Sequence, residues 1–151
     1  MHISDNFNSA KKIFEKIQTS HPTLRMIIDK EPENVDISMD IPKQEGLNFD
    51  INLNLQTDEL HISTGDIWCS WFPLKDNEIR ATFVDSVNGM INGKYRIIQF
   101  TKNGKPIKSY LQKPLDGQWK TVFKDIQKTS FPWTKLERKI IINNVPKHLA
   151  E

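Results

Sequence analysis

A chain of 151 residues is long enough for one domain, which can bury a hydrophobic core without disulfides or a metal. The single cysteine excludes an intrachain disulfide and a zinc site made of several cysteines. The N-terminal segment lacks the apolar stretch of a secretory signal, and every apolar run is far too short to cross a membrane. We therefore expect a cytoplasmic protein that folds as one domain over residues 1–151.

The net charge of +2 conceals an uneven distribution along the chain. Residues 1–90 contain 8 Lys+Arg and 15 Asp+Glu, a balance of −7. Residues 91–151 contain 13 Lys+Arg and 4 Asp+Glu, a balance of +9. Such an asymmetry can mark an interaction surface, although the two halves can also interleave in the fold and cancel each other.

The first predicted element is a helix near residues 6–19, because apolar side chains recur there at the spacing of one helix face. That face consists of Phe7, Ala10, Phe14 and Ile17. Pro22 ends the helix. The segment that follows, TLRMIIDKEPEN, is compatible with a further helical turn or with a loop.

Two strands follow at residues 35–41 and 47–55, where apolar and polar residues alternate strictly. Alternation with a period of two predicts one buried face and one solvated face, which is typical of antiparallel sheets. Residues 59–72 then predict a hairpin that turns at Thr64-Gly65.

A second helix is predicted at residues 76–91, with Asp76 as its N-cap. It is followed by a hairpin over residues 94–112, whose Asn103-Gly104 turn is the strongest short-range signal in the sequence. A further strand is expected at residues 118–123, after an Asp-Gly turn.

The tail, residues 125–151, mixes helical and strand signals and supports no single assignment. Runs of strands flanked by helices predict an α+β fold with an antiparallel sheet of about six or seven strands. We expect this sheet to pack against the N-terminal helix and the central helix, with Ile51 and Leu53 buried.

Cys69 lies among aromatic residues in the stretch GDIWCSWFP, so it is either a reactive nucleophile or a core residue. A thiol nucleophile needs a base within hydrogen-bond reach and an open, electropositive site. In the predicted hairpin Leu60 lies opposite Cys69, which directs the nearest candidate base, His61, to the other face of the sheet. We therefore predict that Cys69 is buried in the core and that His61 is a surface residue.

No other pattern in the sequence indicates catalysis or a cofactor. The four histidines show no spacing typical of a metal site, since zinc needs three or four converging ligands. The glycines are scattered among turns and form neither a phosphate-binding loop nor a dinucleotide fingerprint. We therefore predict no catalytic residues, no metal and no cofactor, and we expect a protein that is not an enzyme.

Two polar surfaces are candidates for binding a partner. The first is the solvated face of the two alternating strands, which carries Asp36, Asp40, Asp50, Asn52 and Asn54. Paired carboxylates can act as an acid and a base when their environments differ, but here the neighbours are uniformly polar. This face is therefore either a solvated surface or an acidic docking surface, which would suit a basic partner such as a nuclease domain.

The second candidate surface is the hairpin over residues 94–112. A two-residue turn places Tyr95, Lys108 and Tyr110 on one face, together with Trp119 of the next strand. Aromatic residues interleaved with lysines are typical of single-stranded nucleic-acid platforms, but lysine is also common at sheet edges, where it prevents aggregation. Because the global charge is far from strongly basic, nucleic acid is the less favoured partner.

The run DELHISTGDIWCSWFP, followed by a short helix and the segment GKYRIIQF, resembles a family of small bacterial α+β proteins. The resemblance spans residues 47–122, and some members of that family resemble immunity proteins of interbacterial toxin systems. It implies a bacterial cytoplasmic protein and favours binding over catalysis. It transfers no catalytic or binding residue to this chain.

Two hypotheses of function result. In the first, the chain is a non-enzymatic module, of immunity type or otherwise, that binds another protein through an exposed sheet face. In the second, it binds a small molecule or single-stranded nucleic acid through the aromatic and basic hairpin. The sequence favours the first hypothesis and leaves the working face, the strand order and the oligomeric state open.

Overall fold

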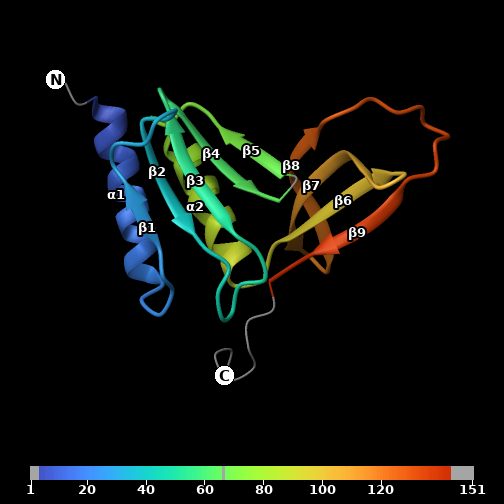
Figure 1. Cartoon of the computed structure of the whole chain (residues 1–151), viewed down its shortest axis with the longest axis horizontal. Helices are drawn as coiled ribbons and strands as arrows, with labels where there is room; N and C mark the ends of the chain where they lie inside the picture. The colour runs from blue at the N-terminus through green and yellow to red at the C-terminus, as the bar shows by residue number, and fades with distance from the viewer. Residues whose placement is uncertain (1–3, 66, 144–151) are drawn as a thin grey trace.

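The computed structural model describes residues 4–65 and 67–143 (Figure 1). In chain order the elements are α1 (Asp5–Ser20), β1 (Ile27–Asp29), β2 (Ile37–Ile41), β3 (Ile51–Gln56), β4 (Glu59–Thr64), β5 (Ile67–Trp71), α2 (Asn77–Ile91), β6 (Arg96–Lys102), β7 (Lys105–Leu115), β8 (Gln118–Ile126) and β9 (Glu137–Ile141). Both predicted helices are therefore present, within two residues of their expected ends.

The strands form two sheets, in which every pairing is antiparallel. The first sheet has the strand order β1-β2-β3-β4-β5, and the second has the order β8-β7-β6-β9. The predicted α+β class is confirmed. The described residues hold nine strands divided between these two sheets, where one sheet of about six or seven strands was expected.

Side-chain caps fix where both helices begin. The Ser4 hydroxyl accepts a hydrogen bond from the backbone N–H of Phe7 at the start of α1. Asp76, the predicted cap of α2, accepts hydrogen bonds from the backbone N–H groups of Glu78 and Ile79. Each cap satisfies backbone donors that have no partner inside the helix.

The apolar face of the first sheet packs against both helices, and α2 runs behind β3 and β4 in Figure 1. Ile51 and Leu53 are buried, as predicted. The rings of Phe14 in α1 and Phe83 in α2 lie 6.4 Å apart, and Trp71 of β5 meets Phe83 edge to face at 5.6 Å. The apolar side chains that alternate along β2 to β5 thus point toward the helices and form the core with them.

The second sheet joins the same core through its inner face. Ile97 and Leu111 belong to one hydrophobic cluster with the first sheet, and the Trp71 ring lies 5.8 Å from that of Phe123. The acidic part of the sequence builds the first sheet and both helices, whereas the basic part builds the second sheet (Figure 1). The two halves do not interleave, so the charge asymmetry is also an asymmetry in space.

The hairpin of β4 and β5 has a register that differs from the predicted one. Thr64 pairs with Ile67, and Leu60 pairs with Trp71 instead of Cys69. Each partner is displaced by two residues because the turn begins one residue later than expected. A displacement of two residues leaves every side chain on its predicted face, since the side-chain period of a strand is two.

Three segments also differ from the sequence interpretation. Residues 47–50, predicted as part of a strand, lie outside β3, with one isolated bridge between Gln44 and Leu47. The segment after α1, predicted as helix or loop, contains the short strand β1. In the tail, β9 returns to pair with β6, and residues 144–151 lie outside the described part of the chain.

Candidate binding surface

The outer face of the second sheet displays cations and aromatic rings in rows that cross the strands. The first row consists of Arg138, Phe100, Lys108 and Ile126. The second row consists of Ile140, Ile98, Tyr110 and Lys124. The third row consists of Arg96, Gln112 and Thr121. Opposed residues share a face, and successive rows are about 7 Å apart.

We call a subset of these residues, extended by Trp119, the cationic sheet face: Arg96, Phe100, Lys108, Tyr110, Trp119, Lys124 and Arg138. Trp119 belongs to it because it precedes Thr121 by two residues on β8 and lies under Arg96. The Arg96 guanidinium carbon is 4.1 Å from the centre of the Trp119 ring. The Arg96 Nε also donates to Gln112 Oε1 at 3.0 Å, which fixes the guanidinium over the ring.

Two lysines flank the central ring of the cationic sheet face. The Nζ atoms of Lys108 and Lys124 each lie 5.4 Å from the centre of the Tyr110 ring. Phe100 meets Tyr110 edge to face at 5.2 Å, and Lys108 Nζ is 5.0 Å from the Phe100 ring. These distances are within the range of cation–π attraction, so the rings and cations hold one another in an interleaved arrangement.

No carboxylate of the described residues lies in the three rows. Asp116 lies in the β7–β8 turn, Asp125 pairs with the buried Ser109, and Glu137 alternates with Arg138 and so belongs to the opposite face. Desolvation by its neighbours, and then repulsion from Arg138, lower the pKa of Arg96. The cationic sheet face therefore carries positive charge that the described part of the protein does not neutralise.

A β-bulge between Phe100 and Thr101 decides which residues share this face. It shifts the pairing by one residue relative to an uninterrupted hairpin, so that Tyr110 pairs with Ile98. Lys108 and Tyr110 do share a face with Trp119. Phe100, which the uninterrupted hairpin assigns to the core, is half-buried on the outer face.

Tyr95 does not belong to this face, contrary to the sequence interpretation. It precedes β6, its backbone N–H donates to Gly89 O at 2.9 Å, and its ring packs against Gly89 of α2. Burial, and then the charge of Asp85, raise the pKa of its hydroxyl. Because of the bulge, Tyr95 lies on the core side of the strand.

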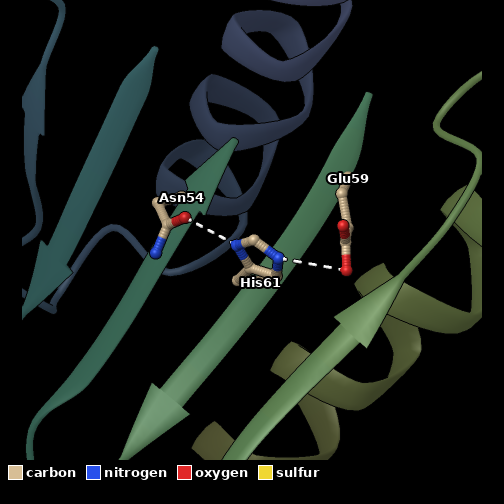
Figure 2. Close-up of polar contacts among 3 residues, drawn as sticks. All are labelled: Asn54, Glu59 and His61. Carbon is tan, nitrogen blue, oxygen red and sulfur yellow. Dashed lines mark hydrogen bonds and ion pairs between the residues drawn. The ribbon is translucent and has the colours of Figure 1, made fainter. Parts of the chain in front are cut away.

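The polar face of the first sheet carries a chain of side-chain hydrogen bonds. His61 Nδ1 lies 2.9 Å from Asn54 Oδ1, and His61 Nε2 lies 3.3 Å from Glu59 Oε1 (Figure 2). Asn54 Nδ2 donates to Asn52 Oδ1 at 3.1 Å, and Asn52 Nδ2 donates to Asp40 Oδ1 at 2.6 Å.

The prediction that His61 is a surface residue is wrong, because its exposed fraction is only 2%. The Trp68 ring covers it edge to face at 4.8 Å, and Asn54 and Ser38 beside it are also buried. Both ring nitrogens face partners from the sheet itself (Figure 2). His61 therefore fixes the polar side of the sheet.

Two of the predicted acidic residues bind backbone groups. Asp36 Oδ2 accepts from the N–H of Thr57 at 2.7 Å, and Asp50 Oδ1 accepts from the N–H of Lys43 at 2.6 Å.

Three of the five predicted residues on this side line one hollow. Asp40, Asp50 and Asn52 contribute to its walls, and its volume is about 520 Å³. Asn54 is buried in the hydrogen-bond chain, and Asp36 lies beside the β3–β4 turn. The structure thus brings Asp40, Asn52 and Asn54 together in one network and leaves Asp36 outside it.

Cys69 is buried in the core with none of its surface exposed, as predicted. Burial, and then the negative charge of Asp125, raise the pKa of the Cys69 thiol above its ordinary value. Its strand directs it to the face opposite His61, whose ring nitrogens face Asn54 and Glu59. Since the thiolate is the reactive form, this cysteine is a packing residue.

We expect the folded protein to react with a thiol reagent only as fast as it opens. Cys69→Ala should lower the free energy of unfolding by about 1–2 kcal/mol, because it removes a buried group and leaves a small cavity. Labelling with a chromogenic disulfide, with and without urea, measures the first effect, and urea unfolding curves measure the second. Rapid labelling in native buffer would contradict a buried thiol.

Within residues 4–65 and 67–143, no group of three or more His, Cys, Asp or Glu side chains could hold a metal ion. Neither helix described there is long and apolar enough to cross a membrane. Comparisons of the chain with protein-family models, curated proteins and solved structures find no match. The resemblance to immunity-type proteins therefore stays a prediction, and the geometry of the two sheets carries the functional argument.

Sequence reasoning missed four members of the cationic sheet face, Arg96, Phe100, Lys124 and Arg138. Lys124 lies beyond the predicted end of its strand, and Arg138 lies in the tail that supported no assignment. Arg96 and Phe100 are brought to this face by the bulge. The one signal that includes all the cations is the positive balance of residues 91–151.

Proposed function

We propose that this protein is a non-enzymatic binding protein, that the cationic sheet face is its working surface, and that its partner is a polyanion. The observation that carries the proposal is the gathering of Arg96, Lys108, Lys124 and Arg138 on one face with no carboxylate among them in the described residues. Such a face accelerates the encounter with an anionic partner and disfavours basic ones.

The separation of charge between the two sheets supports the same surface. The net negative part of the sequence forms the first sheet and the helices, and the net positive part forms the second sheet. A polyanion approaching the protein is therefore repelled from one half and attracted to the other, which orients it toward the second sheet before contact.

A second candidate function is the binding of a basic protein partner, as an immunity-type module would do. The hollow lined by Asp40, Asp50 and Asn52 favours it, because a lysine or arginine side chain would find two carboxylates there. The hollow supports this second function less strongly than the cationic sheet face supports the first. Asp50 already accepts a hydrogen bond from a backbone N–H, and Asp40 already accepts one from Asn52.

Charge reversal tests the proposed surface. Lys108→Glu with Lys124→Glu should elute from immobilised heparin at a lower salt concentration than the parent. The plot of log affinity against log salt should become less steep by about 1–2, because two contacts between lysines and anionic groups of the partner are lost. Circular dichroism checks that the variant is folded.

The matched control is Lys12→Glu with Lys16→Glu, which makes the same change of net charge on the exposed side of α1. It should elute close to the parent protein. If both pairs lower the elution salt equally, retention follows net charge alone, and the cationic sheet face is not the working surface.

A further inference from the structure

We propose that the polyanion is a single-stranded nucleic acid, whose bases stack on the rings of the cationic sheet face while its phosphates meet the surrounding cations. This inference rests on the proposed function and names the partner of the same surface. The rings distinguish this partner from an acidic protein surface, which would need only the cations.

The rings and cations alternate at close spacing. The Nζ atoms of Lys108 and Lys124 each lie 5.4 Å from the Tyr110 ring, and the Arg96 guanidinium lies 4.1 Å from the Trp119 ring. Trp119 is 40% exposed although Arg96 lies over its ring. Single strands bind best where aromatic faces accept bases and a row of cations follows the backbone, because every base has a flat face to stack.

A duplex fits this surface poorly. Base pairs in a duplex already stack on one another, so the rings of a flat sheet find no free base face. Readout of the major groove of a duplex uses a helix or a two-stranded ribbon that enters the groove. Here the cations lie on the broad face of a four-stranded sheet, and both described helices belong to the other half.

The loop between β8 and β9 adds a pair of exposed rings beyond those of the cationic sheet face. Phe131 and Trp133 stack with ring centres 4.9 Å apart and an angle of 9° between their planes. Their exposed fractions are 67% and 78%, the largest among the large apolar side chains of the described residues. The loop arches outward from the end of the second sheet in Figure 1.

Lysines lie beside this exposed pair. Phe131 helps to line a hollow of about 350 Å³ together with Lys102 and Lys105 of the β6–β7 hairpin and Lys128 of the loop. No carboxylate lines that hollow among the described residues. Exposed rings and lysines therefore also occur together in the β8–β9 loop, outside the cationic sheet face.

The test measures fluorescence anisotropy of four labelled probes with the full chain. The probes are an oligothymidylate and an oligouridylate of about 16 nucleotides, a duplex of the same length, and polyglutamate. We expect the two single strands to bind at least tenfold more tightly than the duplex or polyglutamate at equal salt.

Ring variants separate stacking from charge. Tyr110→Leu with Trp119→Leu keeps an apolar side chain at each position and all the cations, and should weaken single-strand binding between about fivefold and 150-fold for each ring lost. Polyglutamate and heparin binding should change less than twofold. Trp68→Leu, which removes a half-exposed tryptophan of the first sheet, is the control and should leave single-strand binding unchanged.

The outcomes separate this inference from the proposed function. Equal binding of all polyanions, or ring variants that bind single strands as tightly as the parent, would overturn the nucleic-acid inference while leaving a polyanion-binding face. Tighter binding of the duplex would overturn it as well. If charge reversal at Lys108 and Lys124 changes the binding of no probe, the proposed function itself fails, and this inference fails with it.

Discussion

Replacing Gly93 with alanine is expected to lower the free energy of unfolding by about 3 kcal/mol or more, because it combines backbone strain with a steric clash. Gly93 follows α2 with a φ of +76°, which costs an alanine about 1–2 kcal/mol. A Cβ at this position would collide with the backbone oxygen of Asn143, which cannot swing aside as a flexible side chain can. Thermal or urea unfolding measures the loss.

Gly104→Ala is the matched control for Gly93→Ala. Gly104 has the same φ of +76°, but a Cβ at this position in the β6–β7 turn would have nothing within 4 Å. Gly104→Ala should lower the free energy of unfolding by about 1–2 kcal/mol, because only the cost of the positive φ applies there. Equal losses at the two glycines would show that the close approach to Asn143 has no energetic consequence.

Replacing Asn143 with alanine should lower the free energy of unfolding by about 2–4 kcal/mol, because it removes two hydrogen bonds and leaves the buried carbonyl oxygen of Met90 without this partner. The Asn143 side chain is buried; its oxygen accepts from the N–H of Asn48 at 2.6 Å, and its nitrogen donates to Met90 O at 2.9 Å. It thereby links the end of β9 to the β2–β3 loop and to the end of α2.

Asn48→Ala provides the comparison for Asn143→Ala. It removes only the exposed bond from Asn48 Nδ2 to Ile142 O and keeps the backbone N–H, so the expected loss is about 0.5–1 kcal/mol. Urea unfolding of both variants, with equal m-values, measures the difference. A loss at Asn143 no larger than that at Asn48 would contradict a buried link between the two halves.

Gly93→Ala and Asn143→Ala both change the junction between the two halves. At this junction the chain passes from α2 to the second sheet, and the end of β9 contacts the first half again. Gly93 and Asn143 meet there, so the position of the second sheet depends on local contacts as well as on the shared core. These contacts hold the second sheet, which bears the cationic sheet face, in a fixed position. A binding surface that is already formed before the partner arrives is therefore expected.

Much of the fold is predictable because the apolar pattern has a strict period. The alternation in β2 to β5 identifies the buried face of each strand. The predicted pairing of the β4–β5 hairpin is wrong by two residues, but a shift of two residues leaves each side chain on the same face. The helices are equally clear, since both have side-chain caps and one apolar stripe.

The binding surface is less predictable because it depends on one-residue and long-range effects. A single bulged residue near Phe100 exchanges the two faces of β6 relative to β7, which removes Tyr95 from the surface and adds Arg96. Arg138 joins only because β9 pairs with β6 across more than thirty intervening residues. Alternation places His61 and Trp68 on one face of the hairpin, but it does not reveal that the Trp68 ring packs over His61 and that His61 is buried.

A nuclear magnetic resonance titration of ¹⁵N-labelled protein with oligothymidylate locates the binding surface residue by residue, because it reports every backbone amide and the indole N–H groups separately. We expect the largest chemical-shift changes on β6, β7 and β8, with the indole N–H of Trp119 among them, and no change on β2 to β4. Shifts gathered instead around Asp40 and Asn52, or no shifts at saturating oligonucleotide, would contradict the assignment of the cationic sheet face as the working surface.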